Sequence, residues 1–158
     1  MYTYFFENCR VVDGDTIEGD LNLGLRIVWN KCKIRFSQIN TPECNSKEKL
    51  EKQCALFCKD FVQKLIENKV VVVKTEHPDS TDSFGRLLGF IFLFDSKSEA
   101  LNTINLNPPL NSLNQLLLDR KLAFKYGIKW KDLNDSAKSE YLSNITELRQ
   151  LIDLTKNT

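Results

Sequence analysis

The order of apolar and polar residues predicts three β-strands in the first 40 positions. Apolar side chains alternate or run together over Tyr4–Asp13, Asp15–Asn22 and Ile27–Ile39, which is the pattern of strands that bury one face. Gly19 and Gly24 fall within and just after the second of these segments, at positions typical of bulges and turns. We therefore expect a meander of three strands.

From Asn45 onward the apolar spacing becomes that of a helix. Asn45 suits the N-cap position, and Glu48, three residues on, is placed to bond back to it in a capping box. Apolar side chains then recur at steps of three and four, which predicts one buried helix face that ends near Asn68. The members of this face are Leu50, Cys54, Phe57, Cys58, Phe61 and Leu65.

Two more strands complete a set of five. Val70–Val73 is a short continuous apolar run, as in a buried strand, and Leu87–Phe94 is a second one. The polar residues 75–83 between them, which include His77, predict a loop. A second loop is expected over residues 102–111, which are rich in asparagine and contain two adjacent prolines.

The last third of the chain has the spacing of two helices. Ser112 and Gln115 are spaced as a capping box before a short helix, whose core face is Leu113, Leu116 and Leu117. A longer helix is expected from Asn134, with one apolar stripe. The members of that stripe are Ala137, Tyr141, Ile145, Leu148 and Ile152.

Five strands, with one helix after the third strand and two more at the end, predict an α+β fold that is mainly β. The arrangement is that of a five-stranded OB-fold Greek-key β-barrel with about three α-helices. At 158 residues the chain suits a single domain, residues 1–158, in which the helix over 134–158 packs on the barrel.

Composition limits which classes of partner this domain can bind. Hydrophobic residues make up 42% of the chain and charged residues 27%, as in ordinary globular proteins, and no apolar run reaches the ~18 residues that span a bilayer. We therefore expect no membrane role. Because the net charge is only +1, any binding of nucleic acid has to come from a local basic surface.

The five cysteines show no paired framework, which favours reduced thiols. The N-terminus has no basic start, apolar stretch and cleavage site of a secretory signal, so we expect a cytoplasmic or otherwise intracellular protein. A zinc site at Cys44, Cys54 and Cys58 is an alternative, but a structural zinc needs a fourth ligand and the chain has one histidine. Small buried side chains on a core face explain these cysteines better.

Polar residues that can do chemistry gather where the third predicted strand ends. Its apolar positions lead into Asn40, Thr41 and Glu43, with Arg35 inside the strand, and Pro42 ends the strand pattern. Rigid strands that end in polar loops are common places for active sites, because the strand holds the side chains still while the loop reaches solvent.

Two other segments supply matching chemistry. Residues 11–16, Val-Val-Asp-Gly-Asp-Thr, predict a strand, a tight Asp-Gly turn and the start of a second strand, with Asp13 and Asp15 at one loop. Residues 82–92 predict a turn that closes on an apolar strand, with Arg86 at its beginning.

Together these segments resemble the staphylococcal nuclease (thermonuclease) family. The family pattern is V-x-D-G-D-T, then R-x-x-x-I-D-T-P-E, then D-x-Y-G-R, and the order and spacing agree over residues 8–127. The resemblance implies the OB-type barrel and a metal-dependent nuclease that acts on DNA, RNA or both. It also implies that Arg35 and Arg86 hold the scissile phosphate and that Glu43 acts as general base or orients the water.

The residue types suit that chemistry. Asp15, the amide oxygen of Asn40 and the backbone carbonyl of Thr41 are oxygen donors of the kind that Ca²⁺, or alternatively Mg²⁺ or Mn²⁺, prefers. Arginine forks match phosphate oxygens and stay charged at any working pH. Taken alone, each of these residues is more often an ordinary surface or turn residue; Asp13 in particular suits a turn that bonds its own backbone.

Four positions depart from the family pattern. Asn40 replaces a metal-binding aspartate, which predicts weaker metal affinity, and Ser83 with Phe84 replaces a lysine and tyrosine that hold a terminal phosphate. Tyr126 is either an aromatic residue of the nucleotide pocket that compensates for this loss or a residue that packs the barrel end. Lys121 stands where relatives have a helix-ending glycine, at a cost on the order of 1 kcal/mol.

Two functions of different class remain. The first is a nuclease with little sequence specificity, endonucleolytic and leaving 3′-phosphates, monomeric and with nucleic acid as its only expected partner. The second is a nuclease-like barrel kept for binding nucleic acid. Arg35, Glu43 and Arg86 together favour the enzyme, because a binding module has no need for this combination.

Overall fold

The computed structural model describes residues 2–77, 79–104 and 111–156. Its strands are β1 (Tyr2–Asp13), β2 (Thr16–Gly24), β3 (Ile27–Phe36), β4 (Ile39–Asn40), β5 (Val70–Thr75), β6 (Leu87–Phe94) and β7 (Phe124–Lys125). Its helices are α1 (Lys49–Ile66), α2 (Lys97–Thr103), α3 (Leu113–Asp119), the short 3₁₀ helix η1 (Trp130–Asp132) and α4 (Asp135–Lys156).

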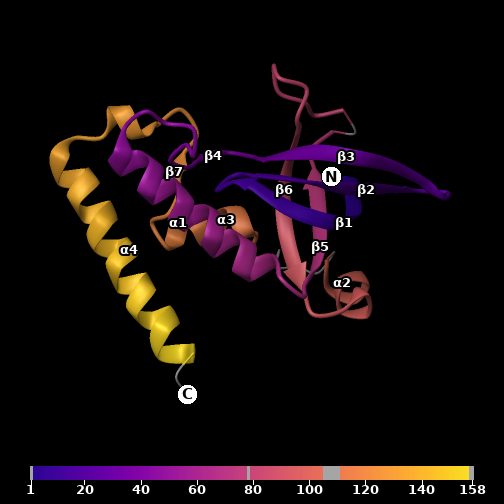
Figure 1. Ribbon diagram of the computed structural model, residues 1–158. Coiled ribbons are helices and arrows are strands. Elements are labelled where there is room, and N and C mark those ends of the chain that lie inside the picture. The colour runs from indigo at the N-terminus through magenta and orange to yellow at the C-terminus, as the bar shows by residue number, and fades with distance from the viewer. Residues whose placement is uncertain (1, 78, 105–110, 157–158) are drawn as a thin grey trace.

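Five of these strands close into a barrel in the order β1, β2, β3, β6, β5 (Figure 1). β1 pairs antiparallel with both β2 and β5, which closes the sheet on itself, and β3 pairs in parallel with β6. The two short strands β4 and β7 form a separate ribbon. A closed mixed barrel with helices around it confirms the α+β, mainly β class and the OB-type architecture.

Gly19 marks a point where two strands approach closely. A Cβ atom at this position would lie 2.6 Å from the carbonyl oxygen of Glu7, so a larger side chain would push β1 and β2 apart. The pairing of β1 with β2 shifts register between Glu7 and Arg10, and Asn8 in this interval has a φ of 50°. The bulge expected at Gly19 is therefore found opposite it, where Asn8 and Cys9 of β1 face the single residue Gly19 of β2.

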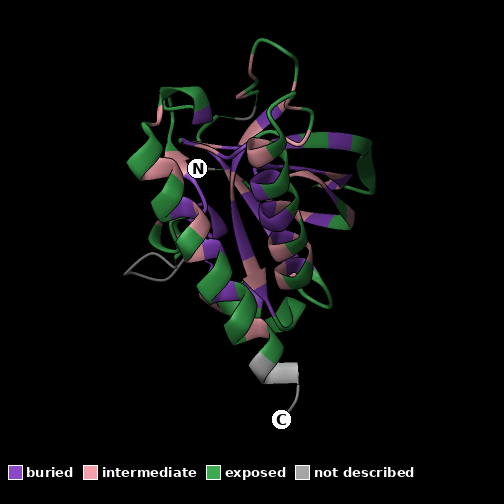
Figure 2. Ribbon diagram, turned by 60° about the vertical axis from the view of Figure 1, so that its left-hand side comes forward, coloured by how far each residue is buried: buried purple, intermediate pink, exposed green. Residues whose placement is uncertain are grey.

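The core is continuous between the barrel and three helices. Buried apolar faces of α1, α3 and α4 join the inward side chains of the strands in one cluster (Figure 2). Tyr141 ties α4 to this cluster, because its hydroxyl donates to the carbonyl of Leu122 at 2.8 Å and lies 2.8 Å from the Cys58 thiol. Burial raises the pKa of Tyr141 well above its ordinary value, so this hydroxyl stays protonated.

Three expectations about the elements need correction. The segment Ile27–Ile39 is not one strand, because it turns at Ser37 and Gln38 and resumes as β4. Gln38 has a φ of 65°, and its carbonyl accepts a hydrogen bond from the backbone N–H of Tyr126. The end of the expected strand thus pairs with β7 and not with the barrel strands.

The start of α1 also differs. Glu48 is the N-cap and makes no side-chain capping bond, so the capping box expected at Asn45 is wrong. Ser46 takes over the local bonding, since its hydroxyl accepts from the Glu48 N–H and donates to Glu51. At the other end the helix stops at Ile66, and Asn68 has a φ of 59°, as in many residues that follow helices.

The described residues contain a fourth α-helix, α2, where about three helices were expected. Its N-cap is Ser96, whose side chain accepts from the N–H of Glu99, and its buried residue is Ala100. Of the capping box expected for α3, the N-cap half is confirmed, because the Ser112 side chain accepts from the N–H of Gln115. The Gln115 side chain donates instead to Asp119. The loop predicted over residues 102–111 begins too early, because Asn102 and Thr103 belong to α2. Its residues 105–110 lie outside the described part of the chain.

Lys121 follows α3 with a φ of 54°, so the left-handed residue expected there is confirmed. None of the helices in the described part of the chain is both long and apolar enough to cross a bilayer.

Candidate functional site

The turn between β1 and β2 presses against the start of the polar loop after β4. Asp13 pairs with Thr16, which leaves Gly14 and Asp15 as the two turn residues. A Cβ atom on Gly14 would lie 2.8 Å from Thr41 Oγ1 and 3.0 Å from Cys58 Cβ. Glycine is required here by this close packing and not by a left-handed backbone, since Gly14 has no positive φ.

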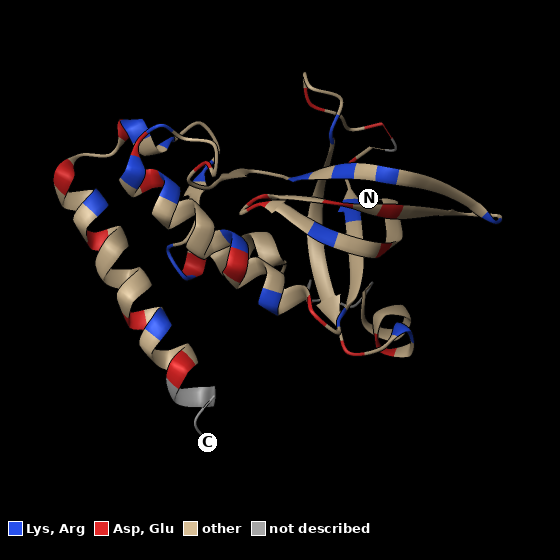
Figure 3. Ribbon diagram, in the orientation of Figure 1, with Lys and Arg blue, Asp and Glu red and all other residues tan. Residues whose placement is uncertain are grey.

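Arg35 lies at the centre of the site and joins two segments of the chain. Its Nη1 is 2.9 Å from Asp15 Oδ2, and its Nη2 donates to the amide oxygen of Asn40 at 2.6 Å. The Asn40 Nδ2 in turn donates to the carbonyl of Ile128 at 3.0 Å. This network, which we call the Arg35 network, fixes the guanidinium between the β1–β2 turn and β4, and Figure 3 shows the acidic turn beside the end of β3.

Asp15 is almost enclosed, with 7% of its surface exposed. Its Oδ2 accepts from the Thr41 N–H at 2.8 Å, and its Oδ1 accepts from the Thr16 hydroxyl at 3.1 Å. Burial raises the pKa of Asp15 and outweighs Arg35 and the Thr41 N–H, which lower it. Both carboxylate oxygens therefore have donors from the protein itself.

Thr41 contributes to the site in two ways. Its backbone N–H holds Asp15, and its buried Oγ1 has no hydrogen-bond partner within the described residues. This oxygen faces the β1–β2 turn, since a Cβ atom built on Gly14 would lie 2.8 Å from it.

Glu43 is exposed, and its side chain makes no hydrogen bond or ion pair with the described residues. Its backbone is held, because the Glu43 N–H donates to Glu51 Oε1 at 3.2 Å while Glu51 Oε2 accepts from Ser46 at 2.6 Å. The loop is thus tied to the first turn of α1, and the Glu43 carboxylate is left free in solvent.

Arg86 immediately precedes β6, the strand that pairs in parallel with the strand that carries Arg35. Leu88, two residues after Arg86, is the register partner of Arg35. The guanidinium is held by Asp82, whose Oδ2 accepts from Nε and Nη2 at 2.7 Å each. It also lies 5.4 Å from the ring centre of Phe84, which is 82% exposed.

Tyr126 is 77% exposed, so it does not pack the barrel end. Its backbone N–H bonds to Gln38, which places the segment 126–128 beside β4 and the Arg35 network. Of the two roles considered for this residue, the one in the nucleotide pocket stays a prediction.

The structure therefore brings Asp15, Arg35, Asn40 and Thr41 into one bonded network, with Glu43 at its edge. In the described part of the chain, no group of three or more His, Cys, Asp and Glu side chains is placed to hold a metal. Cys54 and Cys58 are fully buried, as expected for core residues. His77 lies in an exposed loop.

Sequence reasoning missed three groups that position the site. Asp82 orients Arg86, Glu51 holds the Glu43 loop, and the Ile128 carbonyl fixes Asn40. Asp82 could have been found, because it precedes Arg86 by four residues within a turn sequence. The other two depend on contacts between distant segments and leave no local signal.

Comparison with known proteins identifies a family for this chain. Residues 33–150 match the family model of staphylococcal nuclease homologues. An uncharacterized protein of Methanocaldococcus jannaschii is 30% identical over an alignment of 124 residues, which covers 68% of this chain and 55% of that protein. The chain thus spans about half the length of that relative. The family match contains Arg35, Asn40 and Glu43, whereas Asp15 precedes it.

Proposed function

The chain belongs to the family of staphylococcal nuclease homologues, and from this premise we propose that it hydrolyses phosphodiester bonds of DNA, RNA or both. The observation that carries the proposal is the contrast between Arg35 and Glu43. The guanidinium of Arg35 is fixed by Asp15 and Asn40, whereas the Glu43 carboxylate stands free on a loop whose backbone is held. A fixed cation and a free carboxylate are what phosphate binding and water activation need.

In the proposed reaction Glu43 orients a water and takes its proton as the water oxygen attacks phosphorus. The bond from phosphorus to the 5′ oxygen breaks, and the 5′ oxygen takes a proton from solvent water. The products carry a 3′-phosphate and a 5′-hydroxyl. Arg35 and Arg86 stabilise the charge that develops on the phosphoryl oxygens. Arg86 supports this role because it precedes the strand that pairs with the Arg35 strand, and Asp82 holds its guanidinium.

The donor set also suits a divalent cation by its chemical type. Asp15, the Asn40 amide oxygen and the Thr41 carbonyl are hard oxygen donors. When bound, Ca²⁺ would supply positive charge to the phosphate. The Arg35 guanidinium is already bound to the Asp15 carboxylate and the Asn40 amide oxygen, so a cation has to compete with it for these oxygens. We therefore expect weak metal binding.

Cleavage should show little sequence preference and occur within strands. The residues of the site address phosphate, sugar and water, and specificity for sequence requires contacts to base edges. Phe84 and Tyr126 are exposed aromatic residues that can stack on any base, which tolerates sequence variation.

A second candidate is a nuclease-like module that binds nucleic acid without cutting it. One observation favours it: both arginines of the site are ion-paired within the chain, Arg35 with Asp15 and Arg86 with Asp82. Such pairing lowers the charge available for phosphate, and removing Asp15 or Asp82 would then strengthen binding.

The deciding experiment incubates single- and double-stranded DNA and RNA with the protein and Ca²⁺, Mg²⁺, Mn²⁺ or EDTA. We expect cleavage with 3′-phosphate ends, and Glu43→Gln and Arg86→Ala should each lower the rate by several orders of magnitude, roughly the effect of losing a base or a transition-state donor. The matched controls are Glu76→Gln and Arg120→Ala, which change exposed residues outside the site.

Both site variants should fold like the native protein, as judged by thermal unfolding. A folded native protein that cuts none of these substrates would exclude the enzyme, and retained binding would then support the binding module. Near-native turnover in either site variant would remove the role given to that residue.

A further inference from the structure

The hairpin of β2 and β3 extends beyond the barrel (Figure 1). Apolar side chains at its end are exposed. We call residues 23–31 the hairpin tip. Its exposed apolar residues are Leu23 (43% exposed), Leu25 (95%), Ile27 (55%), Val28 (45%) and Trp29 (43%). They make up five of the twelve large hydrophobic residues exposed in the described part of the chain. Exposed apolar residues gathered in this way mark a surface that contacts a partner.

The tip holds these side chains away from the body of the protein. Leu25 and Arg26 form the two-residue turn between the paired residues Gly24 and Ile27, with φ values of 51° and 65°. Asparagine and glycine suit such a turn, and a leucine there is both strained and fully exposed. The sequence thus places an apolar and a cationic side chain at the outermost point, where neither contributes to the core.

The charge of the tip restricts what can cover it. Arg26 and Lys31 are its charged residues, and it contains no acidic residue. A second copy of the chain would bring like charges together in a symmetric contact, which is unfavourable. A negatively charged partner is complementary.

We propose that the hairpin tip docks on a bilayer surface that carries anionic phospholipids. The aliphatic side chains enter the boundary between headgroups and acyl chains, Trp29 lies at the interface, and Arg26 and Lys31 contact the headgroup phosphates. Nucleic acid would use the cations and the indole ring, but it offers nothing apolar for Leu23, Leu25, Ile27 and Val28.

The depth of insertion is limited by the backbone. In the tip, β2 pairs with β3 alone, so the outer edge of each strand keeps unpaired peptide groups that need water or headgroup oxygens. The proposal is therefore a shallow, reversible docking. It revises the expectation of no membrane role, which considered only segments long enough to span the bilayer.

Tryptophan fluorescence tests the proposal with the protein as it is. The chain has two tryptophans; Trp29 is exposed in the tip, whereas Trp130 is 1% exposed in the core and serves as an internal reference. Vesicles of phosphatidylcholine with phosphatidylserine should shift the Trp29 emission to the blue, and lipids brominated on the acyl chain should quench it. Vesicles of phosphatidylcholine alone should bind much more weakly.

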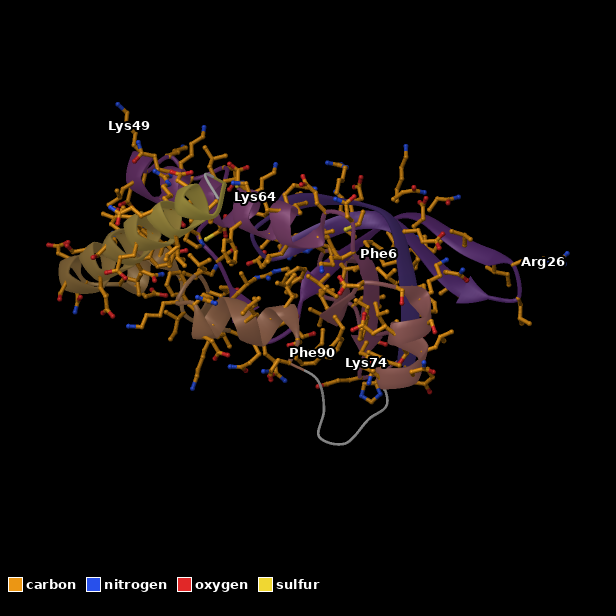
Figure 4. The ribbon with its side chains drawn as sticks, turned by 90° about the horizontal axis from the view of Figure 1, so that it is seen from below. Phe6, Arg26, Lys49, Lys64, Lys74 and Phe90 are labelled. Carbon is orange, nitrogen blue, oxygen red and sulfur yellow. The ribbon has the colours of Figure 1, made fainter. Side chains whose placement is uncertain are left out.

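Two variants separate the apolar and ionic contributions. Leu25→Asn removes the outermost apolar side chain and suits the left-handed turn, so the fold is retained; we expect the partition coefficient to fall about tenfold. Arg26→Gln should lower it about fivefold. The matched controls are Leu101→Asn, an exposed leucine of α2, and Lys49→Gln at the opposite end of the molecule from Arg26 (Figure 4).

Three other outcomes would each overturn the proposal that the hairpin tip docks on anionic bilayers. Equal binding to neutral vesicles would show that the anionic headgroups are not recognised. Tip variants that change only the sedimentation of the free protein would identify a second copy as the partner. Tip variants that weaken only the binding of an oligonucleotide would identify nucleic acid. None of these results depends on nuclease activity, so the test of membrane docking is independent of the proposed function.

Discussion

At the scale of single residues, Asn40 uses both ends of its amide. Its oxygen accepts from Arg35 and its nitrogen donates to the Ile128 carbonyl, so an aspartate would keep the first bond and lose the second. The lost hydrogen bond should cost about 1 kcal/mol of stability. The added charge should also strengthen the proposed cation site, whose one carboxylate is Asp15.

We expect Asn40→Asp to bind Ca²⁺ roughly tenfold more tightly than the native chain, because a second carboxylate attracts the divalent ion across a short distance. Asn40→Ala should bind it more weakly. Calorimetric titration measures both directly, and Asn45→Asp, an exposed residue of the same loop, is the control. Unchanged affinity in Asn40→Asp would show that Asn40 is no ligand.

Asp82 is the residue that positions Arg86. Partial burial raises its pKa, but hydrogen bonds from the Arg86 N–H and guanidinium and from the Phe84 N–H together hold the pKa of Asp82 below its ordinary value of 3.8. A carboxyl group whose pKa is lower in the folded state stabilises the fold above pH 3.8, and this contribution is lost as the pH falls through the lowered pKa.

Asp82→Asn should keep the turn, since the amide oxygen can accept the hydrogen bonds from the backbone N–H groups of Phe84 and Arg86. The amide nitrogen cannot replace Oδ2 as the acceptor for the Arg86 guanidinium. We expect a rate loss of up to about a hundredfold from misplaced Arg86, with Asp79→Asn as the control. The stability difference between native protein and variant should shrink below pH 3.8. A difference that is constant with pH, or a native rate in Asp82→Asn, would contradict the role of Asp82.

At the scale of elements, α3 supports the barrel through Asn114. This side chain is 2% exposed; its oxygen accepts from the Ile91 N–H at 3.0 Å, and its nitrogen donates to the carbonyls of Ser37 at 2.9 Å and Gly89 at 3.2 Å. One amide thus completes the bonding of β6 and of the turn that leads into β4. The position of Asn40 depends on that turn.

Asn114→Ala should lower the free energy of unfolding by about 3 kcal/mol or more, because it leaves buried peptide groups without partners. For a chain of this size the melting temperature should fall by roughly 6–12 °C. Denaturant and thermal unfolding measure both quantities, and Asn102→Ala, at an exposed position of α2, should have little effect. A loss below about 1 kcal/mol would mean that water replaces the amide.

At the scale of the whole molecule, the fold raises the pKa of all five thiols. Burial is the largest cause in each case; it raises the pKa of Cys32 and Cys54 to about 11 and that of Cys9, Cys44 and Cys58 to about 12. Since the thiolate is the reactive form, little of it exists until the pH approaches those values.

At pH 8 we therefore expect the native thiols to react with a disulfide reagent at least about a hundredfold more slowly than thiols of the unfolded chain, in proportion to the thiolate fraction. Absorbance with and without guanidinium chloride measures this, and the unfolded protein should show five thiols. A native thiol that reacts at the unfolded rate would contradict the burial described for it.

The sequence by itself determined the features that rest on local pattern. The strand Leu87–Phe94 and the capping of α3 by Ser112 were predicted as they are found, because alternation, helical spacing and caps act between near neighbours. The motifs also identified Asp15, Arg35, Asn40 and Thr41 as one site, and the structure joins them by hydrogen bonds. The catalytic and metal-binding roles of these residues stay predictions.

Tertiary structure alone decided what those residues bond to. The pairing of β4 with β7 ended the third strand early, and Asn114 reached the barrel from a helix far along the chain. The exposed hairpin tip has the same apolar pattern as a buried strand, and only the position of the rest of the barrel leaves it uncovered. The local sequence pattern shows which side chains are apolar. Whether those side chains are buried depends on contacts with segments that are distant in the sequence.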